Sequence, residues 1–367
     1  MRTARPALAA VAALAAVACA ADTRWSGEVA VKDLVKIEGP DNLIVAPGAR
    51  VRFEAGGRLL CKGNSFLAQG AAFSASEPLD GQPRIQFSSV TARFEDCSFT
   101  GVSTANNRWH NASVTFFESR VAFVRNTVAG CSAVEFVRCE SGDIAGNVFT
   151  DGDETLVLFH TRHATVKGNT FRRCNVGVKL NTADDCLVES NRAHDCQAIA
   201  VLLYGRSCDN RVIGNSVFGG GYGLAVRAGG ARNCFVSNLM DGARCGLRLW
   251  DPGPDNRLLN SVFYKNSLGV EVKSMAKGAT FLVQNSAFAE CGATAGAAAN
   301  GLILRNNLVW NSKKHIVAEE GCAVEEADTI KSDPKFVNAA EGDFRPAEGS
   351  PLLDAGAPAG TNIGLFP

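Results

Sequence analysis

Asparagine recurs at nearly one interval through the middle of the chain, and this spacing constrains the fold more than any other feature. Nine residues are separated by steps of 21, 22, 22, 24, 23, 22, 25 and 22: Asn126, Asn147, Asn169, Asn191, Asn215, Asn238, Asn260, Asn285 and Asn307. Apolar residues accompany them at fixed offsets, such as Ile144 three before Asn147 and Phe149 two after it. So regular an interval indicates a repeat architecture in which each interval is one structural unit.

Each unit contains a short segment in which apolar and polar residues alternate. Five segments share one pattern: residues 177–181, 223–227, 246–250, 269–273 and 301–305. Alternation at period two predicts β-strands, and helical repeats would be longer, at ~33 to 47 residues. We therefore predict an all-β, single-domain parallel β-helix solenoid with coils of about 22 residues, whose equivalent strands pair at roughly 4.8 Å. Asparagine suits its turns because it tolerates the left-handed conformation and stacked amides can hydrogen-bond.

With these repeats the chain resembles the right-handed parallel β-helix superfamily, which has the pectin-lyase-like fold. Within it, the chain is similar to secreted short-repeat proteins of the NosD, carbohydrate-binding and sugar-hydrolase type. Residues 333–337, 342–346 and 349–356 also resemble the tail that ends many such proteins. The resemblance implies a right-handed solenoid, but it does not assign a function because one scaffold hosts many functions.

Four segments are expected along the chain. Residues 1–20 are predicted to be a signal peptide, because Arg2 and Arg5 precede an apolar stretch that ends in small residues. Residues 21–90 are expected to form N-terminal capping coils, residues 91–312 the repeats, and residues 313–367 a C-terminal covering segment that shields the end of the solenoid. The protein is thus expected in the periplasm, at the cell surface or outside the cell. Simple cleavage is favoured over lipid anchoring at Cys19, which stays open.

The overall charge excludes some partners. The 37 Lys and Arg residues equal the 37 Asp and Glu residues, so no global field favours nucleic acid. Beyond the N-terminal stretch no segment is apolar enough to span a membrane, and we expect a monomer.

Cysteines also follow the repeat. Of the 13 cysteines, Cys131, Cys174 and Cys196 each lie five residues after a repeat asparagine, which predicts an inward stack at one turn. Neighbouring side chains in such a stack point the same way, so mostly free thiols are expected rather than disulfides. The sequence has no Cys-x-x-Cys pair and its five histidines are scattered, so no metal site is predicted.

Chemistry is expected on the outward positions of the repeated strand, since alternate residues are taken by the core. Two outward columns are predicted. The first contains Glu135, Leu158, Lys179, Leu202, Ala225, Arg248, Glu271 and Ile303. The second contains Val137, His160, Asn181, Tyr204, Arg227, Trp250, Lys273 and Arg305. Together they predict a basic and aromatic face about six coils long.

Such a face suits a polysaccharide that carries uronic acids. Cations pair with carboxylates and aromatic rings offer flat platforms to sugars, which makes Asn181, Arg248, Trp250, Glu271 and Lys273 candidate substrate-binding residues. The bland alternative is that outward strand positions are charged or aromatic because solubility and β-propensity select such residues.

Catalysis is left undecided by the sequence. A polysaccharide lyase or C5-epimerase needs a carboxylate neutraliser, a base and an acid. Lys179, Arg227, Tyr204 and His160 are the candidate catalytic residues, with the first two as neutraliser or base and the others as proton carriers. The Tyr-Gly-Phe-Asp-Pro-His signature of alginate epimerases is absent. The alternative is a non-catalytic surface or periplasmic accessory protein that only binds. No cofactor is certain, and Ca²⁺ stays open because Asp151, Asp153 and Glu154 are close in sequence.

Overall fold

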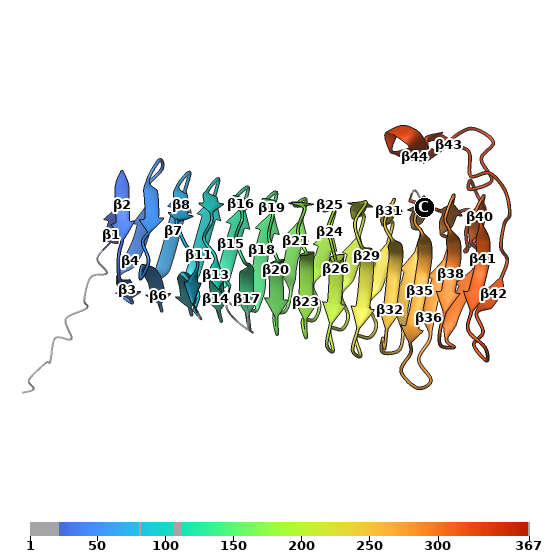
Figure 1. The fold of residues 1–367 in the computed structure, drawn as a ribbon, viewed down its shortest axis with the longest axis horizontal. Coiled ribbons are helices and arrows are strands. Elements are labelled where there is room, and N and C mark those ends of the chain that lie inside the picture. The colour runs from blue at the N-terminus through green and yellow to red at the C-terminus, as the bar shows by residue number, and fades with distance from the viewer. Residues whose placement is uncertain (1–21, 81, 106–111, 366–367) are drawn as a thin grey trace, which may run out of the picture.

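The protein is a parallel β-helix whose coils stack along its long axis (Figure 1). The computed structural model describes residues 22–80, 82–105 and 112–365. The predicted signal peptide and Cys19 lie outside these residues. Within the described ranges no helix is long and apolar enough to cross a membrane.

Each coil contributes one strand to each of three parallel sheets, which we name A, B and C. Sheet A contains β1 (Asp22–Trp25), β4 (Asn42–Val45), β7 (Ser65–Gln69), β11 (Thr91–Glu95), β15 (Arg120–Val124), β18 (Ser141–Ala145), β21 (Ala164–Lys167), β24 (Leu187–Glu189), β27 (Arg211–Ile213), β30 (Cys234–Val236), β33 (Asn256–Leu259), β36 (Phe281–Gln284), β39 (Leu302–Arg305) and β42 (Glu325–Ala327).

Sheet B contains β2 (Glu28–Val31), β5 (Arg50–Phe53), β8 (Ala72–Ala75), β12 (Ser98–Thr100), β16 (Thr127–Ala129), β19 (Val148–Thr150), β22 (Thr170–Arg172), β25 (Arg192–His194), β28 (Ser216–Phe218), β31 (Leu239–Asp241), β34 (Val262–Tyr264), β37 (Ala287–Ala289) and β40 (Leu308–Trp310).

Sheet C contains β3 (Leu34–Glu38), β6 (Arg58–Lys62), β10 (Ile85–Ser88), β14 (Val114–Phe117), β17 (Val134–Val137), β20 (Glu154–Phe159), β23 (Val176–Asn181), β26 (Ile199–Tyr204), β29 (Tyr222–Arg227), β32 (Cys245–Trp250), β35 (Leu268–Ser274), β38 (Ala293–Ala297) and β41 (Lys314–Ala318). Two short pairs complete the fold. They are β9 (Leu79–Asp80) with β13 (Thr104–Ala105), and an antiparallel hairpin of β43 (Phe336–Asn338), η1 (Ala339–Glu341) and β44 (Asp343–Pro346).

The core is a set of side-chain stacks that run along the axis. Alternation within each strand sends every second side chain inward, where it meets its copies from the next coils. Phe149 and Phe171 stack with ring centroids 5.0 Å apart, and Phe116 lies 5.1 Å from Phe87 and 5.0 Å from Phe136. The apolar repeat therefore builds one continuous core.

The asparagine repeat forms a buried ladder, with one correction to the expected positions. From Asn126 to Asn238 each asparagine occupies one turn, and up to Asn215 the amide oxygen of the next residue in the ladder accepts hydrogen bonds from both the backbone and side-chain N–H groups, as at Asn147 and Asn169 (2.9 and 2.8 Å). In the next two coils Ser261 and Ser286 take the ladder position before Asn307 resumes it. The assignment of Asn260 and Asn285 to the ladder is thus wrong by one residue.

The left-handed turn position is the residue before the ladder, not the ladder asparagine itself. Gly146 and Gly168 hold it with φ of 65° and 63°, and Asn260 and Asn285 hold it with φ of 50° and 53°. Asparagine tolerates the left-handed conformation, so it can stand either in the ladder or at the left-handed position one residue before it. A second ladder, which the spacing analysis did not identify, runs through Asn210, Asn233 and Asn256 at another turn.

The twelve described cysteines are free thiols, and nine of them are buried. Burial raises the pKa of the Cys139 thiol to about 11 and that of Cys131 to about 12. These side chains fill the core as small apolar groups.

The chain ends in a segment that folds back onto sheet B. We name residues 336–365 the C-terminal strap. Phe344, Leu352 and Ile363 of the strap bury apolar outward residues of β31, β34, β37 and β40. The amide of Asn285 donates to the carbonyl oxygen of Ala357 (2.9 Å) and its oxygen accepts from the N–H of Ala357 (3.0 Å). Asn285, which lies one residue outside the ladder, therefore binds the strap, and Asn260 does so through the carbonyl oxygen of Asn362.

Residues 292–300 are rich in Ala and Gly, a composition that favours a protruding loop. They instead contain β38, which pairs with β35 and β41. The small side chains leave the backbone free to pair, so the coil continues.

Candidate functional site

The outer face of sheet C carries three columns of side chains, set by the strand register. The first column runs through Glu154, Val176, Ile199, Tyr222, Cys245 and Leu268. The second runs through Glu135, Val157, Lys179, Leu202, Ala225, Arg248, Glu271 and Gly296. Leu158 was expected in it but lies fully in the core, and Ile303 lies on sheet A. In β20 the outward residues are Val157 and Phe159, one place before those predicted.

We name the third column the outer column, and it contains most of the predicted second column. It runs through Phe117, Val137, Phe159, Asn181, Tyr204, Arg227 and Trp250. Phe159 takes the place expected for His160, which follows the strand in a left-handed turn with φ of 48°. A register shift between Leu249 and Trp250 pairs Trp250 with Ser274 rather than Lys273, and Arg305 lies on sheet A.

Cations and aromatic rings alternate along this face. The Arg227 guanidinium lies 4.2 Å from the centroid of the Trp250 ring and 5.6 Å from that of Tyr204. The Lys179 ammonium also lies 5.6 Å from the centroid of the Tyr204 ring. Arg248 lies 5.1 Å from the Trp250 centroid and 4.4 Å from that of Tyr222, whose hydroxyl accepts a hydrogen bond from it. These cation–π contacts hold the rings and the cations in fixed positions.

Carboxylates neutralise most of these cations. The ammonium of Lys179 lies 2.6 Å from a Glu154 oxygen, and Glu271 pairs with both Arg248 (3.3 Å) and Lys273 (3.0 Å). The Lys179 and Arg248 side chains are only 16% and 17% exposed, so these pairs are partly shielded from solvent. Arg227 differs, because it is exposed and forms no ion pair within the described part of the chain.

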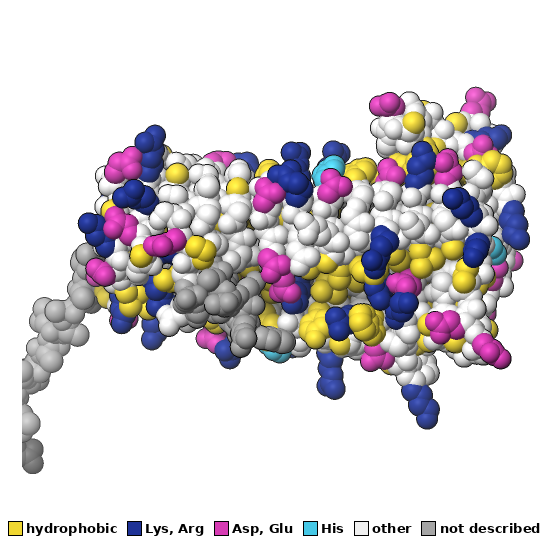
Figure 2. Space-filling model, viewed as in Figure 1, with side chains coloured by type: hydrophobic (Ala, Val, Ile, Leu, Met, Phe, Trp, Pro, Cys, Tyr) yellow, Lys and Arg dark blue, Asp and Glu magenta, His cyan; other side chains and the backbone are white. Residues whose placement is uncertain are grey.

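The surface beneath these side chains is apolar. Val176, Leu202 and Ala225 point outward yet are buried, and they pack with Ile199 and Tyr204. Figure 2 shows hydrophobic side chains gathered on the lower middle of the solenoid, with basic and acidic groups around them. Cys245 lies in the first column, and burial raises the pKa of its thiol, which disfavours the thiolate form.

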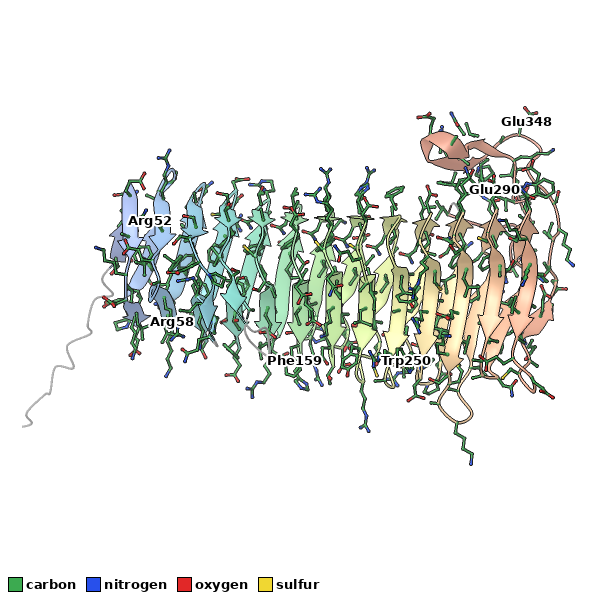
Figure 3. The ribbon with its side chains drawn as sticks, in the orientation of Figure 1. Arg52, Arg58, Phe159, Trp250, Glu290 and Glu348 are labelled. Carbon is green, nitrogen blue, oxygen red and sulfur yellow. The ribbon has the colours of Figure 1, made fainter. Side chains whose placement is uncertain are left out.

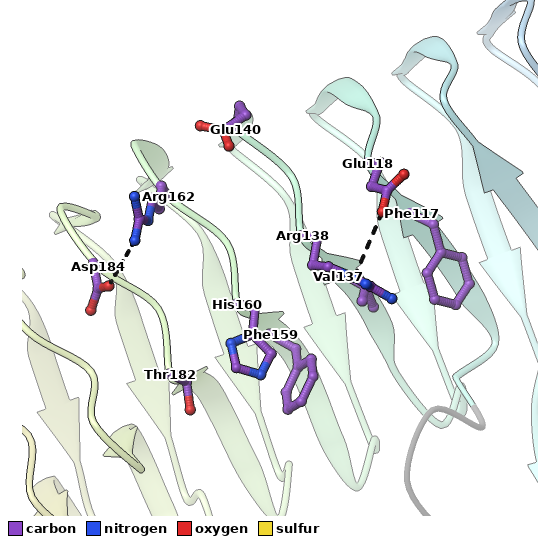
Figure 4. A pocket seen from close by; sticks show the side chains of 10 residues that line it. All are labelled: Phe117, Glu118, Val137, Arg138, Glu140, Phe159, His160, Arg162, Thr182 and Asp184. Atoms are coloured by element: carbon purple, nitrogen blue, oxygen red, sulfur yellow. Dashed lines mark ion pairs between the residues drawn. The ribbon is translucent and has the colours of Figure 1, made fainter.

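His160 lies beside the outer column in a cavity of about 870 Å³ (Figure 4). Its ring meets the Phe159 ring edge-on at 4.3 Å between centroids. The ion pairs at the cavity are long, at 3.8 Å for Arg138 with Glu118 and 3.9 Å for Arg162 with Asp184. Thus the structure separates His160 from the Tyr204, Arg227 and Trp250 series, although Phe159 and Trp250 lie on the same side of the solenoid (Figure 3).

Comparisons with known proteins fit this architecture. The family model described as "Periplasmic copper-binding protein (NosD)" matches residues 95–287, more than half of the chain. The chain belongs to the NosD family. No curated protein sequence matches it.

Solved structures show the same fold. The periplasmic alginate epimerase AlgG is similar at 10% sequence identity with a TM-score of 0.52, over 81% of this chain and 78% of that one. The catalytic domain of a GH87 alpha-1,3-glucanase in complex with nigerose gives 11% identity and a TM-score of 0.48, over 84% of this chain and 64% of that one. At these identities the likeness to the epimerase shows the parallel β-helix fold alone.

The described residues of this NosD family member offer no cluster of ligands that fits a copper ion. Across residues 22–80, 82–105 and 112–365, no three His, Cys, Asp or Glu side chains gather closely enough to hold a metal ion. The carboxylates considered for calcium are engaged separately: Asp151 binds Arg173 (2.7 Å), Asp153 accepts from Asn175 (2.8 Å), and Glu154 binds Lys179.

Proposed function

We propose that this NosD family member is an exported protein that binds an acidic polysaccharide along the outer column of sheet C. The observation that carries the proposal is Arg227, an exposed cation without a carboxylate partner in the described structure, placed between the rings of Tyr204 and Trp250. A uronic acid over this position would meet a cation for its carboxylate and an aromatic surface for a neighbouring sugar ring.

The apolar surface supports the same function. The buried outward residues Val176, Leu202 and Ala225 pack with Tyr204 and support its ring, whose flat face a sugar can cover.

The geometry favours binding over catalysis. A base must offer a lone pair to the substrate, yet the Lys179 ammonium is held by Glu154. His160 lies in the cavity next to Phe159, whose strand is two coils from that of Tyr204. His160 therefore stands apart from Lys179 and Arg227, which both lie 5.6 Å from the Tyr204 ring centroid. We keep the polysaccharide lyase or epimerase function as the second outcome of the test.

Export is part of the proposal. The predicted signal peptide over residues 1–20 and the periplasmic description of the family both support it.

Calorimetric titration of the mature protein with acidic and neutral hexasaccharides tests the proposal. We expect binding of acidic oligosaccharides that falls about tenfold in Arg227→Gln. Arg211→Gln is the matched control, because Arg211 is an exposed arginine on sheet A. Equal affinities for both variants would contradict the proposal.

The same samples are monitored at an absorbance of about 232 nm, with and without calcium, because β-elimination creates an unsaturated uronate. A rise that Lys179→Ala abolishes would establish lyase activity in place of binding alone. We expect no rise.

A further inference from the structure

The outer column has an aromatic ring on every second coil. Phe117, Phe159, Tyr204 and Trp250 occupy alternate coils. The coils between them carry Val137, Asn181 and Arg227 at the same position. Four rings therefore repeat with a period of two coils.

This period corresponds to a definite length. Strands of neighbouring coils lie roughly 4.8 Å apart, so successive rings are spaced by roughly 9.6 Å. The series from Phe117 to Trp250 covers six coil spacings, or roughly 29 Å. A ligand that contacts all four rings must be extended, and its structure must repeat over a length equal to two coil spacings.

The cavity beside His160 belongs to this series. Phe117 and Phe159 line it with Val137 between them, and Figure 4 shows the two rings along the same wall. The two long ion pairs, Arg138 with Glu118 and Arg162 with Asp184, leave charged groups of both signs at its rim. Exposed pairs of this length are weak, so these groups can exchange their partners for sugar hydroxyls.

The positions between the rings are polar toward the C-terminal end. Asn181 is buried, at 6% exposure, whereas Arg227 is exposed and offers an uncompensated cation. The rings and Arg227 thus lie under different units of a bound chain. Arg227 would face the unit that carries a negative charge.

We propose that the ligand is an extended acidic glycan whose structure repeats every two sugars, with alternate sugars stacked on Phe117, Phe159, Tyr204 and Trp250. The inference rests on the proposed function and adds the repeat of the substrate. Two kinds of glycan have such a repeat. One alternates an acidic with an uncharged sugar, and the other is a single uronate whose successive units are turned over.

Binding of oligosaccharides of increasing length distinguishes these two kinds of glycan. Affinities are measured from tri- to octasaccharide for hyaluronan, which alternates two sugars, and for oligomannuronate, which contains one. We expect affinity to rise in steps, with a large gain for every second sugar added. Steps with hyaluronan alone support an alternating composition, and steps with oligomannuronate support a turned-over uronate chain.

A matched pair of variants locates the steps. Trp250→Ala is expected to remove one step and to lower hexasaccharide affinity roughly tenfold. Trp310→Ala is the control, because Trp310 is a similarly exposed tryptophan on sheet B, at 39% against 42%. Both side chains are exposed, so neither change should disturb the coil.

The outcomes separate the two proposals. A smooth gain with each added sugar, while Arg227→Gln still weakens binding, overturns the two-sugar repeat and leaves the proposed function standing. Absence of binding to any acidic oligosaccharide overturns the proposed function and the inference with it. A step retained in Trp250→Ala but lost in Trp310→Ala would also overturn the inference.

Discussion

Two outer faces of the solenoid are built alike but are used differently. Sheet B carries Phe218, Tyr264 and Trp310 on alternate coils, as sheet C carries Phe159, Tyr204 and Trp250. On sheet B the strap covers the part of this column around Tyr264, whose ring meets that of Phe344 at 5.2 Å between centroids, while Trp310 stays exposed. On sheet C the described chain places no segment over the rings. Alternating rings therefore form a surface that an extended chain can cover.

The residue between the rings differs in charge. Asp241 stands between Phe218 and Tyr264, whereas Arg227 stands between Tyr204 and Trp250. Burial raises the pKa of Asp241, with Lys265 opposing the effect. The covered face thus has a partly shielded acid at this position, and the open face has an exposed cation.

The largest expected effect is on the covered face. Phe344→Ala should lower the free energy of unfolding by about 3 kcal/mol, because a buried ring is lost from a packed contact. Tyr204→Ala on the open face should lower it by less than about 1 kcal/mol. Urea unfolding followed by circular dichroism measures both. Similar losses would mean that the two faces are equally buried.

A smaller effect is expected where the strap is tied. Asn285→Ala should cost about 2 kcal/mol, because the hydrogen bonds with Ala357 are lost. Asn311→Ala is the control, since Asn311 shares the left-handed conformation (φ 48°) but is exposed. Hydrogen exchange of the Ala357 amide should accelerate in the first variant alone. Unchanged exchange there would show that the packing of the strap suffices.

Ionic strength should weaken ligand binding on the open face. Affinity for an acidic hexasaccharide should fall severalfold as salt rises, because the contact with Arg227 is screened. The dependence should become shallower in Arg227→Gln. Lys265→Gln should keep the original slope, although Lys265 also lies over an aromatic ring, Tyr264 (4.7 Å). An unchanged slope in Arg227→Gln would exclude this cation from the contact.

The smallest effect concerns pH on the covered face. The pKa of Asp241 is higher in the folded than in the unfolded chain, so the folded state binds more protons between the two values. Stability should therefore fall slightly as pH rises from the ordinary aspartate pKa through the raised one. Asp241→Asn should remove this fall in thermal unfolding scans. A fall of the same size in the variant would assign it to another group.

Much of the fold could be predicted from the sequence because its information is local and repeated. The asparagine interval and the alternation in residues such as 177–181 define a coil without any long-range contact. The same alternation brings Lys179, Asn181, Tyr204, Arg227 and Trp250 to one face, since strand register propagates from coil to coil.

The wrongly predicted outward residues arise where one additional or one missing residue shifts the strand register. His160 was placed outward, but the left-handed turn begins one residue earlier than the repeat suggests, and Phe159 has that position. Lys273 was likewise displaced by the irregularity after Leu249. The position of the strap could not be predicted, because its contacts are as much as 102 residues apart in sequence, as between Asn362 and Asn260.

The pairs Asn260–Ser261 and Asn285–Ser286 were nevertheless visible in the sequence. In each pair a hydroxyl takes over the internal ladder and the asparagine moves one place outward. The exchange turns an internal brace into an external attachment point without changing the coil. Replacing Gly146 and Asn147 by Asn and Ser, or Gly214 and Asn215 in the same way, would place the attachment point on another coil. Two adjacent residues in a coil would then determine the coil to which a covering segment is hydrogen-bonded.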